Sequence, residues 1–336
     1  MRRCLIWILA GVFALVGCQG GEKDTGGDKA DKLTVGLVLS VGGLGDKSFN
    51  DSAYEGLSKA EREFGIVPLY GQPEQMSEDE KYLRQYAEQG ADLVIGVGFL
   101  MKDALDKVAA EFPGKRFAII DAEVDQPNVA SLVFREHEGS FLVGAIAGLV
   151  SRTGKVGFVG GMEIPLIHKF AVGYTEGVKY VRPDADVIVA YAGSGPQAFS
   201  DPVKGKSLAL SQFDRGADVI FQAAGSTGNG VIDAAQERGL FAIGVDANQN
   251  YMAPGHVLTS MLKRVDVSVF QIIKDVVEGR FEGGVHVYGL EIDGVGYALD
   301  EYNKDLIPDE VLARVEEIRA EIVAGTIHVT DYTATH

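Results

Sequence analysis

Polar and aromatic side chains stand directly after several short apolar runs that have the length of β-strands. Asp46, Phe49 and Asn50 follow the first of these runs, within the segment GGLGDKSFNDSAYEG at residues 42–56. Apolar residues then recur at helical spacing, which predicts a connection from a strand to a helix that starts near Ser52. In an open parallel sheet such connections lie at the carboxyl ends of the strands, where ligands bind. The segment therefore has the expected position of a binding loop.

The composition of this loop also fits a binding site. Its glycines permit tight turns, while Asp46, Asn50 and Asp51 offer hydrogen-bonding edges and Phe49 offers a flat apolar face. The alternative interpretation is a glycine-rich turn with a helix cap, because Ser48 or Asn50 could cap the helix that follows.

Further polar or aromatic residues occupy the same kind of position along the chain. They are Asp121, Phe134, Phe199, Asp246 and Lys263. Each has an ordinary structural explanation, because an Asp after a strand often caps the next helix, a Phe is usually core and a Lys is usually solvated. Their recurrence in both halves of the chain favours a shared cleft between two facing lobes.

Motifs typical of catalysis or of cofactor binding are missing from the sequence. There is no Walker A pattern, no GxSxG elbow and no HExxH pair, and residues 43–48 carry only the first half of a GxGxxG fingerprint. The loop GSTGNG at 225–230 could cradle an anion at a helix N-terminus. Because it carries no Lys or Arg, we interpret it as a loop in which Gly225 lets a ligand approach the backbone. We therefore expect no enzymatic activity, no cofactor and no metal.

Length and composition predict a soluble body with two lobes. The 336 residues suit two lobes of about 100–200 residues each. The chain is 46% hydrophobic and 24% charged, which is ordinary for a globular protein. Its net charge of −17 argues against nucleic acid as a partner, since phosphate contacts depend on clustered Lys and Arg.

The N-terminus resembles a secretion signal that ends in a lipid-attachment site. Arg2 and Arg3 precede an apolar run at 5–16 that is short for a transmembrane helix. The run ends in LVGC, which looks like a bacterial lipobox, so we expect Cys18 to be lipidated, with palmitate among its acyl groups. The alternatives are an ordinary signal peptide or a signal anchor.

In this interpretation residues 1–17 are a signal peptide and Cys18 begins the mature protein. Residues 18–32 are polar, rich in glycine and without periodicity, which is typical of a flexible tether. Loss of the signal peptide changes the net charge to −19. The protein is thus expected in the bacterial cell envelope, attached to the lipid bilayer and facing the extracytoplasmic side.

From Leu33 onward, strand-like runs alternate with amphipathic runs, which is typical of parallel sheets covered on both faces. The strand-like runs are 35–39, 67–70, 93–97, 117–120, 129–134, 156–159, 187–192, 219–223, 241–245, 257–261 and 285–290. The helical runs are 52–64, 77–89, 102–112, 138–151, 167–181, 205–215, 231–238 and 266–278. The second half repeats the pattern of the first, so we predict two similar α/β lobes.

Six segments resemble, in order, the basic-membrane-protein family of bacterial lipoproteins. They are GLGDKSFNDSAYEGL (43–57), FREHEGSFLVGAIAG (134–148), SDPVKGK (200–206), AAGSTGNGV (223–231), GVDANQ (244–249) and TSMLKRVDVSV (259–269). Within this family the chain is similar to the purine-nucleoside receptor lipoproteins of ABC transporters. The resemblance implies a type I periplasmic-binding-protein fold, with two doubly wound parallel-sheet lobes joined by a multi-crossover hinge. We expect lobe 1 to comprise 33–122 and 248–282, and lobe 2 to comprise 123–247 and 283–325.

The resemblance also implies roles at the base end of a purine nucleoside. Phe49 and Phe199 would sandwich the base, and Asp46 and Asn50 would hold its polar edge. The run GSGPQAFSDP around Phe199 is longer than the GSF-type run usual in the family.

At the ribose end, the resemblance implies that Asp121, Asp246 and Lys263 hold the sugar while Gly225 gives close backbone approach. Lys263 is the one cation among these candidates, whereas a nucleotide would need several, so a nucleoside is favoured over a nucleotide. The expected partners are a purine nucleoside (inosine, guanosine or adenosine), an ABC transporter permease and the lipid bilayer.

Two other functions stay open at this point. A sugar or other small-solute receptor on the same scaffold would not need two facing aromatic rings. A nucleoside hydrolase would need a water held beside the anomeric carbon, often by a metal and a cluster of aspartates, and the sequence has no such cluster.

Overall fold

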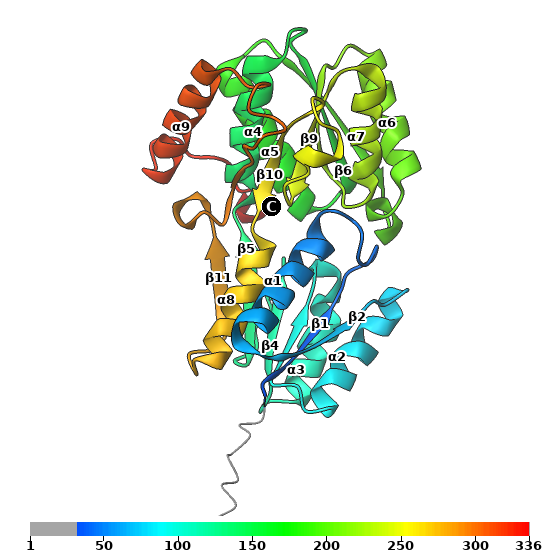
Figure 1. Ribbon diagram of the computed structural model, residues 1–336, viewed down its shortest axis with the longest axis vertical. Coiled ribbons are helices and arrows are strands. Elements are labelled where there is room, and N and C mark those ends of the chain that lie inside the picture. The colour runs from blue at the N-terminus through cyan, green and yellow to red at the C-terminus, as the bar shows by residue number, and fades with distance from the viewer. Residues whose placement is uncertain (1–31, 336) are drawn as a thin grey trace, which may run out of the picture. The chain divides into compact units, whose positions relative to one another are not determined.

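The computed structural model describes residues 32–335, and its strands form two separate sheets (Figure 1). The first sheet contains β1 (Thr34–Val38), β2 (Val67–Gly71), β3 (Leu93–Gly96), β4 (Arg116–Ile120), β5 (Val129–Phe134) and β11 (Gly284–Tyr288). The second contains β6 (Lys155–Met162), β7 (Asp186–Gly193), β8 (Val219–Ala223), β9 (Phe241–Asp246), β10 (Val257–Lys263) and β12 (Val295–Tyr297).

The two sheets have matching strand orders. The first runs β11-β5-β4-β3-β1-β2 and the second β12-β10-β9-β8-β6-β7. All pairs are parallel except the one between β10 and the short β12. Parallel sheets bury both faces, which is why the central strands, such as β3 and β4, are nearly continuous apolar runs, whereas the edge strands β2, β7 and β11 are partly exposed. The predicted α/β class with two parallel-sheet lobes is confirmed.

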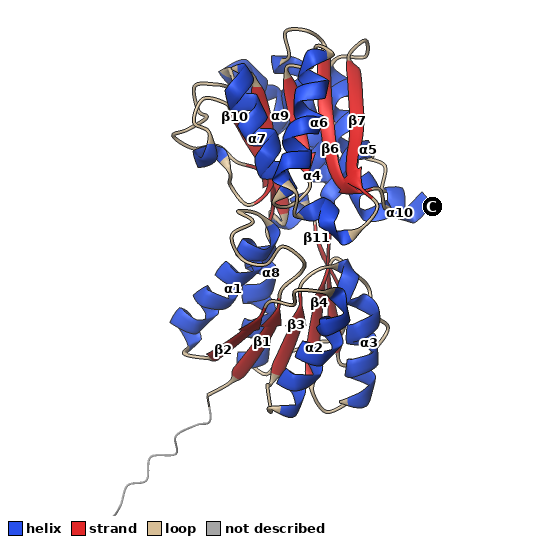
Figure 2. Ribbon diagram, turned by 90° about the vertical axis from the view of Figure 1, so that its right-hand side faces the viewer, coloured by secondary structure: helices blue, strands red, loops and turns tan. Residues whose placement is uncertain are grey.

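Helices cover both faces of each sheet (Figure 2). On the first sheet they are α1 (Phe49–Phe64), α2 (Asp79–Glu88), α3 (Lys102–Glu111) and α8 (Val265–Val277). On the second they are α4 (Glu136–Val150), α5 (Pro165–Val181), α6 (Pro202–Asp214) and α7 (Thr227–Arg238), with α9 (Asp309–Val323) on α4 and α10 (Tyr332–Thr335) on α5. Short 3₁₀ turns are η1 (Met76–Glu78), η2 (Phe99–Met101), η3 (Pro196–Phe199), η4 (Asn250–Met252) and η5 (Leu290–Ile292).

Strand residues of the first sheet alternate between two hydrophobic cores. Ile95 packs in the core that contains Leu57 of α1, whereas its neighbour Val94 packs with Leu83 of α2 and Leu105 of α3. This alternation follows from the period of two residues along a strand. The alternation determines which helices cover which face of the sheet, and the parallel pairing places the loops that follow the strands at one edge.

The helical run expected at 138–151 is α4, which is almost wholly buried and packs very closely on α5. A Cβ added to Gly144 would lie 2.2 Å from the carbonyl oxygen of Tyr174, and one added to Gly173 would lie 2.3 Å from that of His137. Only glycine permits this approach between the two backbones. Among the described residues, α4 included, the structure contains no helix with both the length and the apolar character to span a bilayer.

The chain passes from one sheet to the other three times within residues 32–335: from β5 into α4, from β10 into α8, and from β11 through η5 into β12. Strand pairing corrects the expected lobe boundaries. Residues 129–134 and 284–288 belong to lobe 1, and residues 257–263 belong to lobe 2. The boundaries were misplaced because an apolar run shows that a strand forms but does not show which sheet accepts it. The predicted signal peptide (1–17) and nearly all of the predicted tether (18–32) lie outside the described residues.

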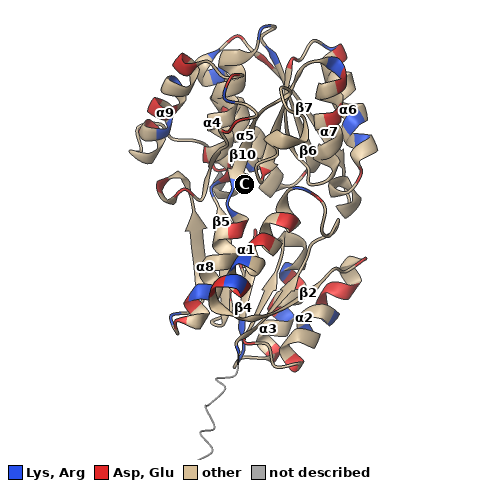
Figure 3. Cartoon of the chain, in the orientation of Figure 1, with Lys and Arg blue, Asp and Glu red and all other residues tan. Residues whose placement is uncertain are grey.

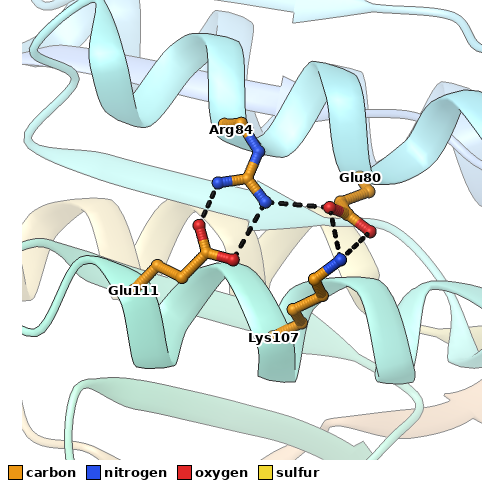
Figure 4. A network of polar contacts seen from close by, with 4 residues as sticks. All are labelled: Glu80, Arg84, Lys107 and Glu111. Carbon is orange, nitrogen blue, oxygen red and sulfur yellow. Dashed lines mark hydrogen bonds and ion pairs between the residues drawn. The ribbon is translucent and has the colours of Figure 1, made fainter.

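Charged residues of both signs are interspersed over the helices of both lobes (Figure 3). Figure 4 shows one group that links α2 to α3. Arg84 pairs with Glu80 at 2.8 Å and with Glu111, and Lys107 pairs with Glu80 at 2.9 Å. Exposed ion pairs of this kind contribute little one by one, and this group lies on the outer face of lobe 1, formed by helices α2 and α3.

Candidate functional site

A cavity lies between the two lobes, at the carboxyl ends of their strands. Eight of the ten residues predicted for the site line it: Asp46, Phe49, Asn50, Asp121, Phe199, Gly225, Asp246 and Lys263. Sequence reasoning missed other lining residues, among them Ser40, Phe99, Leu166, Ile167 and Phe170. The cavity is therefore built from loops that are far apart in the sequence.

Asp46 forms the N-terminal cap of α1. Its carboxylate accepts hydrogen bonds from the backbone N–H groups of Ser48 (2.9 Å), Asn50 (2.8 Å) and Asp51 (3.2 Å), and from Asn50 Nδ2 (3.1 Å). The helix begins at Phe49, three residues before the expected start near Ser52, and the side chain that caps it is that of Asp46, whereas the sequence indicates Ser48 and Asn50 as candidates. Burial raises the pKa of Asp46, although the backbone donors act against this. These four bonds use the acceptor sites of its carboxylate.

Asn50 retains hydrogen-bonding capacity toward the cavity. Its Oδ1 accepts from the backbone N–H of Ser40 at 2.8 Å, and its Nδ2 donates to Asp46. The side chain is almost fully buried and its orientation is fixed by these two bonds. One N–H and one lone pair of the amide are left for a ligand.

Two predicted site residues, Asp51 and Phe134, do not line the cavity. Asp51 accepts from the backbone N–H groups of Gly45 (2.7 Å) and Lys47 (3.0 Å), so it shapes the loop instead. It follows Asn50 by one helical position, which turns its side chain to a different face. Phe134 is buried against Tyr288, with ring centroids 5.1 Å apart.

Aromatic rings from both lobes border the cavity. Phe199 ends η3, where its carbonyl accepts from Ser226 Oγ at 3.1 Å and its ring lies against Gly161, at which a Cβ would clash at 2.2 Å. The ring of Phe99 meets Phe199 edge-on, with centroids 6.4 Å apart. Phe99 follows the strand run at 93–97, so the rule that indicated Phe49 could also have found it.

Three buried charged residues, Asp121, Asp246 and Lys263, line one side of the cavity and form its floor, whereas Glu136 contacts Lys263 without lining the cavity. Lys263 Nζ lies 2.6 Å from Asp121 Oδ2 and 3.2 Å from Glu136 Oε1. Burial acts to lower the pKa of Lys263, but the carboxylates of Asp121, Glu136 and Asp246 outweigh it and raise the pKa. The ammonium also lies 5.2 Å from the ring centroid of Phe49. Lys263 is therefore charged and shared between several partners.

The carboxylates around Lys263 differ in their surroundings. Burial raises the pKa of Asp121 despite Lys263, and its Oδ1 is buried with no hydrogen-bond partner among the described residues. Burial also acts to raise the pKa of Glu136, but the ammonium groups of Lys169 and Lys263 outweigh it and lower the pKa. Burial raises the pKa of Asp246 to about 7, and this residue accepts a hydrogen bond from Ser48 Oγ.

Four hydrogen-bond contacts join the loop before α1 to lobe 2 beside the cavity, one of them from Ser48 Oγ to the carbonyl of Val245 at 3.3 Å. Ser48 Oγ donates to Asp246, Asn229 Nδ2 donates to the carbonyl of Asp46 at 3.3 Å, and Gln249 Nε2 donates to the carbonyl of Lys47 at 3.0 Å. The lobes are thus closed on one another around the cavity.

The arrangement suits reversible binding of a small polar molecule with a flat face. Acceptors and one cation lie at the floor, and aromatic rings lie at the sides. Within residues 32–335 there is no cluster of His, Cys, Asp or Glu able to hold a metal ion.

Two doubly wound lobes with a cavity between them define a solute-binding protein of the periplasmic-binding type. Residues 33–333 match the family described as ABC transporter substrate-binding protein PnrA-like, and the chain belongs to this family.

Known relatives agree with this assignment. An uncharacterized lipoprotein of Pyrococcus abyssi is 36% identical over 337 residues, which cover 93% of this chain and 83% of the relative. The ABC transporter nucleoside-binding protein BmpA of Lactococcus lactis subsp. cremoris is 33% identical over 345 residues, covering 96% of each chain. The crystal structure of an ABC transporter solute-binding protein from Aeropyrum pernix K1 is 34% identical, with a TM-score of 0.82, and the match covers 89% of this chain and 93% of that one.

Proposed function

We propose that this protein captures purine nucleosides in the interlobe cavity and delivers them to an ABC transporter permease. The observation that carries the proposal is the pairing of aromatic side walls with a floor of buried carboxylates around a single ammonium group. One end of the cavity thus suits a base, and the other suits a sugar.

Stacking supplies affinity at the base end. Phe49 comes from lobe 1 and Phe199 from lobe 2, so both rings can reach a base only when the lobes are closed. In other proteins, stacking on an aromatic side chain contributes about 1–3 kcal/mol per base. Asn50, with one free donor and one free acceptor, is the group we assign to the polar edge of the base, because the carboxylate of Asp46 is occupied by the helix cap.

Hydroxyl recognition supplies specificity at the sugar end. Asp121 Oδ1 needs a hydrogen-bond donor, and a ribose hydroxyl provides one in a charge-assisted bond. Asp246 can accept a second hydroxyl beside Ser48. A phosphate is disfavoured, because Lys263 is already neutralised by Asp121 and Glu136 and because the surrounding carboxylates would repel an anion.

Delivery to a permease and attachment to the membrane complete the proposal. Membership of the family places the protein with ABC transporter substrate-binding proteins, and the relative from Pyrococcus abyssi is a lipoprotein. We assign the lipid to Cys18, which would place the protein on the extracytoplasmic face of a membrane with inosine, guanosine or adenosine as candidate cargo.

A ligand screen tests the proposed function. Thermal-shift measurements on residues 19–336 with nucleosides, free bases, nucleotides and sugars should show stabilisation by purine nucleosides above all others. Calorimetry then gives the affinities, and chromatography of the same samples checks that the nucleoside is returned intact. Preference for ribose or another sugar would assign a sugar receptor, and release of free base would assign a hydrolase.

A further inference from the structure

The buried ion pair between Lys263 and Asp121 continues into lobe 2 through two further charged residues. Glu136 places Oε1 at 3.2 Å from Lys263 Nζ and Oε2 at 2.6 Å from Lys169 Nζ. The side chains of Lys169, Glu136, Lys263 and Asp121 are only 8%, 1%, 2% and 5% exposed. Two carboxylates and two ammonium groups thus alternate along one buried row.

This row lies where the chain passes between the lobes. Glu136 comes two residues after the end of β5, and Lys263 is the last residue of β10. Lys169 reaches the row from α5, and its Nζ also donates to the carbonyl of Phe134 at 2.6 Å. Lys169 does not line the cavity, so any effect on a ligand has to pass through its neighbours.

Glu136 and Asp121 compete for Lys263. In the structure the ammonium lies nearer to Asp121, at 2.6 Å, than to Glu136, at 3.2 Å. Glu136 is otherwise neutralised by Lys169. Removal of the Lys169 charge would leave a buried carboxylate whose nearest remaining cation is Lys263, and an unpaired charge in such a place is strongly unfavourable.

We propose that Lys169 is a positioning residue for the sugar end of the cavity. By neutralising Glu136 it keeps Lys263 on Asp121, and so keeps both groups where a ribose hydroxyl meets them. This inference rests on the proposed function for its ligand, although its structural part does not.

The test compares four variants, using inosine and its free base hypoxanthine as probes. Lys169→Met should lower the affinity for inosine about tenfold and change the affinity for hypoxanthine by less than about twofold, because only the sugar end of the cavity is disturbed. Lys169→Arg keeps the charge and should restore most of the inosine affinity. Adding Glu136→Gln to Lys169→Met removes the competitor of Asp121, so the double variant should bind inosine within about threefold of wild type. Lys179→Met is the matched control, because this lysine lies on the same helix and donates to backbone carbonyls away from the cavity.

A purely structural role for Lys169 predicts the opposite pattern. The double variant would then be at least as weak as Lys169→Met, and inosine and hypoxanthine would weaken together. Either result overturns the proposal. If Lys169→Met does not fold, the double variant alone decides, because it contains no unpaired charge at this position. Inosine affinity of that variant near the wild-type value supports the proposal, and loss of its inosine affinity, with or without loss of hypoxanthine affinity, overturns it.

A second measurement separates this inference from the proposed function. Crystal structures of ligand-free wild type, Lys169→Met and the double variant would locate Lys263 Nζ. We expect it on Glu136 in Lys169→Met and on Asp121 in the other two. If wild type binds no nucleoside, the proposed function fails, but this comparison still stands. A Lys263 that stays on Asp121 in Lys169→Met would refute the positioning role.

Discussion

Asp121 and Asp246 occupy equivalent positions in the two lobes. Asp121 directly follows β4, and Asp246 is the last residue of β9. These two strands have the same place in the matching strand orders of the two sheets. Both aspartates have a left-handed backbone, with φ of 66° and 63°, which is uncommon for residues other than glycine and costs about 1–3 kcal/mol. Both side chains line the cavity. Two copies of one local geometry thus bring two carboxylates to the same cavity.

Substitution of Asp246 should weaken the binding of nucleosides much more than the binding of free bases. Asp246→Ala removes a charge-assisted bond to a ribose hydroxyl and should cost roughly 1.5–3 kcal/mol, about ten- to a hundredfold in nucleoside affinity. Free purine bases should lose much less. Calorimetry with inosine, guanosine and adenosine and with their bases measures both effects, and the exposed Asp103→Ala on α3 serves as control. Undiminished nucleoside binding would refute the assignment of Asp246.

Substitution of Phe49 should affect nucleosides and bases alike. Phe49→Ala removes a stacking surface worth about 1–3 kcal/mol without touching the carboxylates of the floor. Purine nucleosides and purine bases should therefore weaken by similar factors in the same calorimetric assay, and ribose should bind poorly to every variant. A loss confined to nucleosides would place Phe49 at the sugar end instead.

Nucleoside affinity should depend on pH around neutrality. Burial raises the pKa of Asp246 to about 7, while Lys263 and the Ser48 hydroxyl favour its charged form and Asp121 and Asp46 oppose it. A ribose hydroxyl donates to the carboxylate form, so the affinity should fall as the pH falls from about 8 to about 6, and binding near pH 7 should release a proton.

Calorimetry in buffers of different ionisation enthalpy measures this proton release directly. Asp246→Asn cannot titrate, so it should show a weaker affinity with a flat pH profile over the same range. An equally steep profile in Asp246→Asn would mean that another group carries the effect.

Binding should be coupled to closure of the lobes. The bonds from the loop before α1 to Asp246, Asn229 and Gln249 hold the two lobes together beside the cavity, so opening of the lobes requires these bonds to break. Small-angle scattering should show a smaller radius of gyration with saturating nucleoside than without it. Identical profiles would contradict hinge closure as part of binding.

Membrane attachment should depend on Cys18, which lies outside the described residues. Cys18→Ser should release the protein from the membrane fraction or leave an unprocessed precursor of higher mass. Fractionation and mass spectrometry of the expressed protein distinguish these outcomes. A variant that stays in the membrane fraction with unchanged mass would contradict lipidation at this position.

Much of the fold was predictable because local patterns determine the elements. Every strand-like run from 35–39 to 285–290 forms a strand, and the predicted helices form within a few residues of their expected bounds. The sheet that each strand joins was harder to predict, because the pairing of β5, β10 and β11 depends on residues far away in the sequence.

Residues of the candidate site that directly follow or end strands could be predicted from the sequence. Residues that are brought together by helix packing could not. Asp121, Asp246 and Lys263 follow or end strands, and all three line the cavity. Glu136 lies just before the expected helical run at 138–151 and Lys169 lies within the run at 167–181, and only the packing of α4 on α5 shows that the two are buried together. A single sequence contains no signal for such a pair.

The glycine contacts between α4 and α5 have a mechanical consequence. Gly173 contacts the carbonyl of His137 at a distance that leaves no room for a methyl group. His137 is the residue after Glu136, and Gly173 lies four residues after Lys169 on the same helix. The two helices are therefore packed together as one rigid unit. Glu136 and Lys169, the buried charged residues on these helices, move with it. Any rotation between the lobes is then concentrated in the few residues that join them. A change as small as Gly173→Ala would push the two helices apart and so alter, from outside the cavity, the positions of the side chains that line it.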